Sequence, residues 1–207
     1  MMADFLIADK IVRGFENRYA NNPIDRGGET YAGISRIHWP DADIWPRIDA
    51  MKSMRNFPVN LRHEKLAPMV AIFYQRNFWN KLNASLYPNQ LIANQIYDMA
   101  VNMGVQRAGI HLQRTLNLLN RRGQDYPDIV VNGAIGRKTI KALESYQVKR
   151  GDAGAYTLGF YLLAQMGSLW VKLASNDESQ EDFMNKWGER GLSTALLYSK
   201  HFADKEL

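Results

Sequence analysis

The chain has 207 residues, of which 46% are hydrophobic and 23% are charged, a composition typical of a folded protein with one core or two small lobes. It contains no cysteine, which excludes disulfide bonds, a thiolate nucleophile and a thiolate metal site. The net charge of +5 is compatible with nucleic acid, anionic lipid or cell wall as partners and does not choose between them.

Neither the beginning of the chain nor its most apolar stretch has the pattern of a membrane segment. Acidic residues interrupt the first sixteen positions, which lack the apolar run of a secretory signal. Residues 155–174 are the most apolar stretch, but they contain Gln165, Lys172 and two glycines, which favours a buried helix over a membrane span. We expect synthesis in the cytoplasm without a signal peptide and no stable membrane insertion.

The first helix is expected over residues 4–20, where four apolar side chains recur at steps of four. These side chains are Ile7, Ile11, Phe15 and Tyr19. Pro23 ends this helix, because a proline disfavours the helical conformation in the residue before it. Residues 24–35 contain three glycines and no helical stripe, which predicts a tight turn into a short strand or hairpin.

The rest of the chain is predicted to be helical. A helix with Pro68 in its first turn should run to residue 79, and a second should end at Gly104 as its C-cap. Further helices are expected around Leu112–Leu119, over 136–149 and 154–174, and in two shorter pieces near the C-terminus, with a surface loop at 121–128. The predicted fold class is mainly α, of the α+β kind: a helical bundle with one small β-hairpin after the first helix.

Glu16 is a candidate general acid. It lies at the edge of the apolar stripe of the first helix, where partial desolvation would raise the pKa of its carboxyl group. Cleavage of a glycosidic bond needs such an acid, because the leaving oxygen must be protonated as the bond breaks. Taken alone, the position of Glu16 favours a solvated surface glutamate, because perturbed carboxylates are rare.

Asp25 and Thr30 are candidate partners of Glu16. They follow it by nine and fourteen residues, in the turn and return segment that can fold back toward it. An ionised Asp25 and the Thr30 hydroxyl could hold a water molecule or stabilise positive charge on the sugar ring. The alternative for Asp25 is a turn residue that hydrogen-bonds its own backbone.

The segment GFENRYANNPIDRGGETYAGIS, residues 14–35, resembles the N-terminal motif of the glycoside hydrolase family 108 muramidases, also called secretion-activator or lysozyme-like proteins, which include phage endolysins. NFWNKL (77–82) and IYDMAVNMG (96–104) resemble later family segments. LQRTLN (112–117), VNGAIGRKT (131–139) and KWGERG (186–191) resemble its C-terminal predicted peptidoglycan-binding domain.

This resemblance implies a lysozyme-like fold and hydrolysis of the β-1,4 bond between N-acetylmuramic acid and N-acetylglucosamine in peptidoglycan, with Glu16 as the acid. It also implies a catalytic lobe over 1–92, a peptidoglycan-binding lobe over 93–190 and a C-terminal helix or tail over 191–207. A lytic transglycosylase and a non-catalytic peptidoglycan-binding protein are the alternatives. The enzyme would act in the periplasm or cell wall after release by a holin or a secretion pathway.

Five further residues are candidates for binding substrate. They are Tyr19, Ser35, Tyr74, Trp79 and Asn102. Aromatic faces stack on sugar rings, but Tyr74 and Trp79 also fit core positions of a helix. Asn102 lies one turn from Asp98, and the pair could edge a cleft or join two helices through buried polar bonds.

No cofactor and no metal are expected. The four histidines show no metal-ligand spacing, and the chain has no phosphate-binding or dinucleotide-binding glycine motif. Basic residues are not clustered with aromatic residues, so nucleic acid is not expected as a partner.

Overall fold

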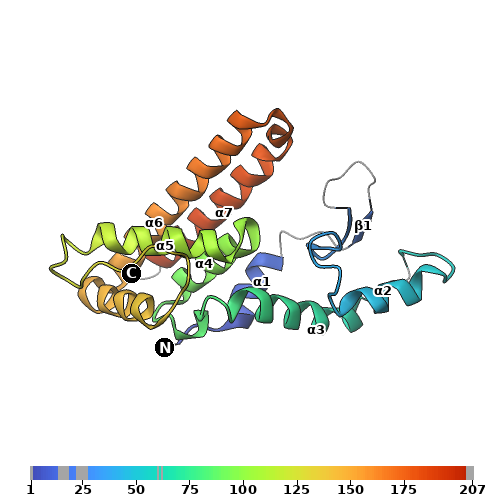
Figure 1. The fold of residues 1–207 in the computed structure, drawn as a ribbon, viewed down its shortest axis with the longest axis horizontal. Helices are drawn as coiled ribbons and strands as arrows, with labels where there is room; N and C mark the ends of the chain where they lie inside the picture. The colour runs from blue at the N-terminus through green and yellow to red at the C-terminus, as the bar shows by residue number, and fades with distance from the viewer. Residues whose placement is uncertain (1, 14–18, 22–27, 60, 62, 204–207) are drawn as a thin grey trace. The chain divides into compact units, whose positions relative to one another are not determined.

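The chain folds into two compact units in the computed structural model (Figure 1). The smaller unit contains Asp9–Asn77, and the larger unit contains Met1–Ala8 together with Phe78–Leu207. The structure describes residues 2–13, 19–21, 28–59, 61 and 63–203. The domain limits predicted from the sequence, at residues 92 and 190, stay a prediction.

The smaller unit is built on a three-stranded antiparallel sheet with strand order β1-β2-β3. The strands are β1 (Tyr19–Asn21), β2 (Glu29–Tyr31) and β3 (Ile34–Ser35). β2 and β3 are joined by a tight turn in which Ala32 and Gly33 have positive φ angles of 47° and 77°. Two helices, α2 (Ile44–Lys52) and α3 (His63–Tyr74), follow the sheet and pack against each other.

The first helix, α1, is shorter than predicted and buries a different face. It covers Phe5–Arg13, and Tyr19 already belongs to β1. The buried side chains are Phe5, Ala8, Asp9 and Val12, at the steps of three and four that a helix of 3.6 residues per turn requires. Ile7 is 51% exposed, so the predicted apolar stripe was wrong. Residues spaced by four do not stay on one face, because each step is longer than one turn of 3.6 residues.

The helix predicted to start near Pro68 begins five residues earlier. α3 starts at His63, and Pro68 lies inside it. Proline has no backbone N–H, so one hydrogen bond of the helix interior is missing there. A π-helical turn, η1 (Gln75–Trp79), continues α3 and carries the chain from the smaller unit into the larger one.

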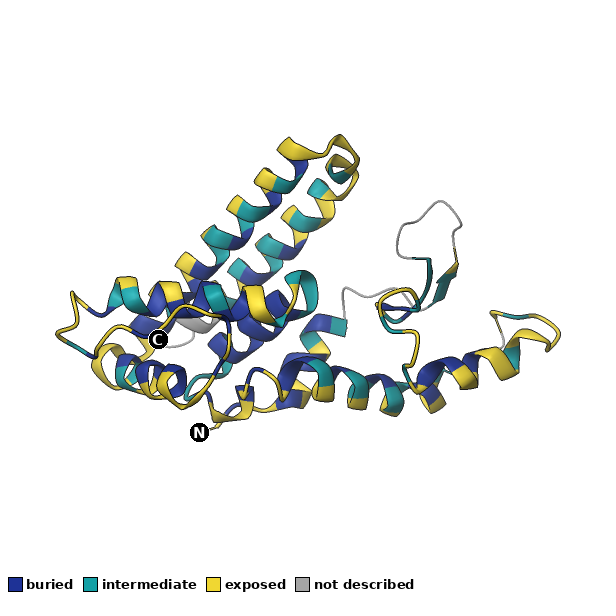
Figure 2. Cartoon of the chain, in the orientation of Figure 1, coloured by how far each residue is buried: buried dark blue, intermediate teal, exposed yellow. Residues whose placement is uncertain are grey.

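The larger unit is an assembly of helices. Its elements are η2 (Ala84–Leu86), α4 (Gln90–Met103), α5 (Val105–Leu119), α6 (Arg137–Asn176), η3 (Glu178–Phe183) and α7 (Met184–Ala203). α4 packs on α5, α6 and α7, while α6 and α7 form an antiparallel pair whose facing sides are buried or half-buried (Figure 2). Gly104 ends α4 with a φ of 91°, as predicted from its C-cap position.

The two helices predicted on either side of residue 151 are also present. Within α6, Gly151 has φ 57° and ψ −151°, which interrupts the helical geometry. A glycine is needed there because this backbone conformation is closed to residues with a Cβ. The two short C-terminal pieces are instead the short η3 and the 20-residue α7.

The core of the larger unit is aromatic at its centre. Trp79 and Tyr97 are fully buried and meet edge to face, with ring centroids 5.6 Å apart, and Phe5 packs edge-on against both. Such aromatic pairs stabilise a core beyond their area of burial. In the described part of the chain, no helix combines the length and apolar character needed to cross a membrane. The predicted fold class, mainly α with a small β element after the first helix, is confirmed.

Candidate active site

The sheet brings two of the predicted site residues together. Thr30 pairs with Ser35 across β2 and β3 and with Ala20 across β1 and β2. Directly paired residues of an antiparallel sheet point to the same face, so the Thr30 and Ser35 hydroxyl groups share one face. The Thr30 hydroxyl donates to the carbonyl of Gly28, 3.2 Å away, and the Ser35 oxygen accepts from the backbone N–H of His38 at 3.4 Å.

Glu16 and Asp25 lie outside the described residues. Glu16 falls between the end of α1 at Arg13 and the start of β1 at Tyr19. Asp25 falls between β1 and β2. Their proposed roles stay predictions, and both positions belong to the stretch of chain that forms the smaller unit.

The opposite face of the sheet carries a charged cluster that the sequence did not reveal. Tyr19 donates to Glu29 at 3.1 Å, and the same carboxylate binds Lys52 at 2.8 Å and Arg36 at 3.0 Å. Arg36 also forms a two-pronged pair with Asp49, at 2.7 and 3.1 Å. Burial and the hydrogen bond to Glu29 raise the pKa of Tyr19. Tyr19, a predicted substrate residue, therefore anchors the sheet to α2 through this cluster.

Hydrogen bonds to Arg36 and Lys52 hold the pKa of Asp49 below its usual value. The reciprocal bonds raise the pKa of both cations: Arg36 chiefly through Asp49, and Lys52 chiefly through Glu29. These groups are all ionised near neutral pH. They attach the β2–β3 region to α2, and so hold the strand that carries Thr30.

Tyr74 is a structural support of the same region. Its ring is buried, and its hydroxyl donates to the carbonyl of Ala32 at 2.8 Å. This bond ties α3 to the strained turn between β2 and β3. We predicted that Tyr74 contacts substrate, but its ring lies in the core, because its position on α3 faces the sheet.

Trp79 and Asn102 lie in the larger unit. Trp79 is 0% exposed, and its indole N–H donates to the Ser85 hydroxyl at 2.7 Å, so it is a core residue. The side-chain oxygen of Asn102 accepts a hydrogen bond from the indole of Trp170 at 3.1 Å. The aromatic residues of the 68–79 segment that we expected to line a cleft are therefore packed inside the protein.

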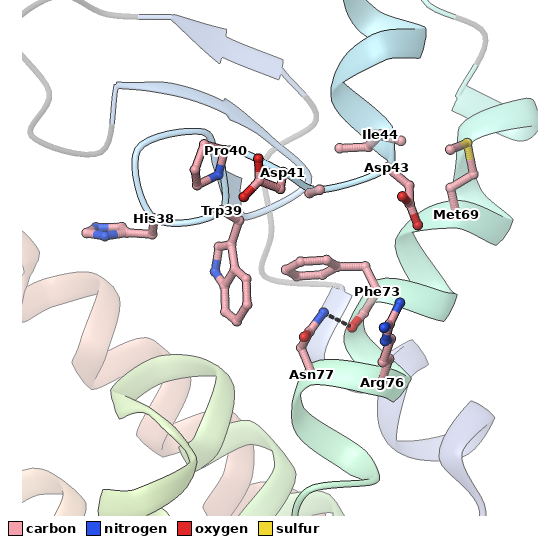
Figure 3. Close-up of a pocket in the computed structure, with 11 residues that line it drawn as sticks. His38, Trp39, Pro40, Asp41, Asp43, Ile44, Met69, Phe73, Arg76 and Asn77 are labelled. Atoms are coloured by element: carbon pink, nitrogen blue, oxygen red, sulfur yellow. Dashed lines mark hydrogen bonds between the residues drawn. The ribbon is translucent and has the colours of Figure 1, made fainter.

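A cavity of about 290 Å³ lies in the smaller unit between the segment that follows β3 and one side of α3 and η1 (Figure 3). Its apolar wall includes Trp39 and Phe73, which meet edge to face with centroids 5.0 Å apart. Polar and charged side chains complete the lining. They are His38, Asp41, Asp43, Arg76 and Asn77. No pattern in the sequence predicted this cavity, because its residues come from two segments that only the fold brings together.

Comparison with family models covers both halves of the chain. Residues 10–104 match the model described as Glycosyl hydrolase 108, and residues 107–191 match the model described as Predicted Peptidoglycan domain. Residues 10–104 therefore form a glycosyl hydrolase family 108 domain, and a predicted peptidoglycan domain follows it. The resemblance predicted from residues 14–35 and from the later motifs is confirmed.

These two matched domains together make the protein a glycoside hydrolase that acts on peptidoglycan and carries a second, peptidoglycan-binding domain. The solved structure of Brucella abortus SagA is similar in fold, with a TM-score of 0.58 and 23% sequence identity over 96% of this chain and 94% of that one. No curated protein matches the sequence. Among the residues that the structure describes, no group of three or more histidine, aspartate and glutamate side chains is placed to hold a metal ion.

Proposed function

We propose that this family 108 enzyme hydrolyses the β-1,4 bond between N-acetylmuramic acid and N-acetylglucosamine, with Glu16 as general acid. The observation that carries the proposal is the match of residues 10–104 to the glycosyl hydrolase model, which runs through Glu16, Asp25 and Thr30. The fold supports it because Thr30 lies in β2, which pairs with β1, the strand that stands between Glu16 and Asp25 in the sequence.

In this mechanism Glu16 gives its proton to the glycosidic oxygen as the bond to the sugar breaks. Positive charge then develops on the ring, and a carboxylate stabilises such charge electrostatically. Asp25 is proposed for this role, or for holding the attacking water. Thr30 would assist through its hydroxyl oxygen, which can accept a hydrogen bond while its proton is donated to Gly28.

The second domain is proposed to keep the enzyme on its insoluble substrate. A second binding module on the same chain raises the effective concentration of the active site near the glycan. The wall is therefore the place where we propose that the enzyme acts, after release by a holin or a secretion pathway. Neither nucleic acid nor a cofactor enters the proposal.

The test is the chemistry of the products. Purified sacculi are digested with the wild-type protein, and the soluble fragments are analysed by mass spectrometry with and without borohydride reduction. The proposal expects fragments with a reducible N-acetylmuramic acid end. Fragments ending in 1,6-anhydro-muramic acid would identify a lytic transglycosylase instead, and reducible N-acetylglucosamine ends would place the cut at the other glycosidic bond.

A non-catalytic binding protein gives a different result in the same assay. It would sediment with the sacculi and release no soluble fragments at any protein concentration. That outcome would contradict hydrolysis while leaving the peptidoglycan-binding domain intact.

A further inference from the structure

The cavity lies between α3 and the segment that follows β3, and hydrogen bonds fix the backbone of one of its walls. The backbone N–H of Trp39 donates to Ser35 at 2.9 Å, and its carbonyl accepts the indole N–H of Trp45 at 2.7 Å. Trp45 is buried, and Arg36 lies over its ring at 4.5 Å. The backbone of Trp39 is therefore held on both sides and its ring packs against Phe73, so this wall of the cavity needs little ordering before a ligand binds.

Three charged side chains that line this cavity do not stabilise the fold through polar contacts with other described residues. Among the described residues, Asp41, Asp43 and Arg76 make no hydrogen bond or ion pair through their side chains. Asp43 stands at the N-cap position of α2, yet its carboxylate makes no capping bond to the described backbone. Elsewhere in the smaller unit, Glu29 and Asp49 are engaged with Arg36 and Lys52.

The arrangement of these groups defines the chemistry of a ligand. All three line the cavity together with Trp39 and Phe73, and Figure 3 shows Asp41 on the Trp39 side of Phe73 and Asp43 and Arg76 on its other side. Two carboxylates attract an ammonium group, and an aromatic face adds a cation–π contribution. A guanidinium group binds a carboxylate through two parallel hydrogen bonds. The apolar wall suits a short aliphatic chain between such groups and the remainder of a ligand.

We propose that this cavity binds the zwitterionic end of a diamino acid residue in a peptidoglycan stem peptide. Such a residue, when not cross-linked, carries an ammonium and a carboxylate on one carbon at the end of an aliphatic side chain. Asp43 holds the ammonium and Arg76 the carboxylate, Trp39 and Phe73 pack against the chain, and Asp41 adds negative charge at the other side of the cavity. The assignment rests on the proposed function, because it makes the stem peptide a second recognition element of the same substrate.

The binding of small probes to the full-length protein tests the chemistry without catalysis. The probes are meso-diaminopimelate, pimelate, which lacks the ammonium groups, and 1,5-diaminopentane, which lacks the carboxylates. Calorimetry or NMR titration should show saturable binding of meso-diaminopimelate, with each of the other two about tenfold weaker or more. Equal binding of pimelate would reduce the cavity to an anion site and overturn the proposal.

Substitutions of cavity residues test whether meso-diaminopimelate binds in this cavity. Arg76→Gln and Asp43→Asn should each weaken meso-diaminopimelate binding about tenfold or more. Arg47→Gln is the matched control, since Arg47 is exposed on α2 and does not line the cavity, and it should bind as the wild type does. Unchanged binding in both cavity variants would place the ligand elsewhere and overturn the proposal.

Turnover links the cavity to the substrate. Wild-type kcat/KM should be higher on glycan strands that carry stems than on strands stripped of stems by an amidase, and Arg76→Gln should bring this ratio toward one. An unchanged ratio in Arg76→Gln overturns the assignment. If the wild type cleaves neither kind of strand, the proposed function fails, and the probe titrations still decide the cavity by themselves.

Discussion

Arg190 donates two hydrogen bonds to a single carboxylate oxygen of Asp98, at 2.9 and 2.7 Å, and both side chains are buried. The pair joins α4 to α7 across 92 positions of sequence. Asp98 belongs to the part matched by the glycosyl hydrolase model, and Arg190 to the part matched by the peptidoglycan domain model. The two matched regions are therefore connected by a buried ion pair inside one compact unit.

Removing the carboxylate from this pair should destabilise the protein strongly. We expect Asp98→Ala to lower the free energy of unfolding by about 3 kcal/mol, because it removes the carboxylate that accepts two hydrogen bonds from the buried guanidinium of Arg190. Chemical denaturation monitored by circular dichroism measures this. Asp182→Ala, at an exposed position of η3, is the control and should change stability by less than about 0.5 kcal/mol. A loss below about 1 kcal/mol for Asp98→Ala would show that the pair is dispensable.

Two helical glycines should respond in opposite directions to alanine. A Cβ at Gly109 would collide with the carbonyl of Gly133, which approaches α5 closely, so Gly109→Ala should cost several kcal/mol. At Gly167 in α6 a Cβ meets no atom of the described structure within 4 Å, so Gly167→Ala should stabilise the helix by up to about 1 kcal/mol. Thermal unfolding of the two variants compares them directly. Equal effects of the same sign would contradict the close approach at Gly109.

His111 should make stability depend on pH. Burial lowers the pKa of its imidazole, despite the hydrogen bond with Gln165 at 2.9 Å. Below the ordinary value of 6.5 the unfolded chain therefore binds more protons than the folded protein, and stability falls as the pH falls toward the lowered pKa. The free energy of unfolding, measured from pH 7.5 to pH 5, should decrease more steeply for the wild type than for His111→Gln. Parallel curves would show that His111 does not contribute.

The sequence predicted the elements whose ends have a local chemical cause. Gly104 ends α4 and Gly151 interrupts α6, because their backbone conformations are closed to other residues. The first helix was predicted less well. Its apolar residues at steps of four continue to Tyr19, which belongs to β1, and periodicity alone could not show this.

The site likewise has one part that a local sequence pattern predicted and another part that depends on tertiary contacts. The motif of residues 14–35 was sufficient to predict the family, since it lies in a continuous segment of the chain. The cluster of Tyr19 and Glu29 with α2 and the cavity beside Phe73 were not predictable. Their members are brought together by tertiary contacts between segments that carry no pattern of their own.

The role of Glu16 is tested most directly by comparing cell-wall clearing by the wild type and by Glu16→Gln. Glutamine keeps the size of the side chain but cannot donate a proton to the leaving oxygen. The account predicts a loss of about 10²-fold or more in the rate of clearing, with binding to sacculi retained. Glu64→Gln, an exposed substitution in α3, should clear walls at the wild-type rate. Clearing by Glu16→Gln as fast as by the wild type would contradict the assignment of Glu16 as the general acid.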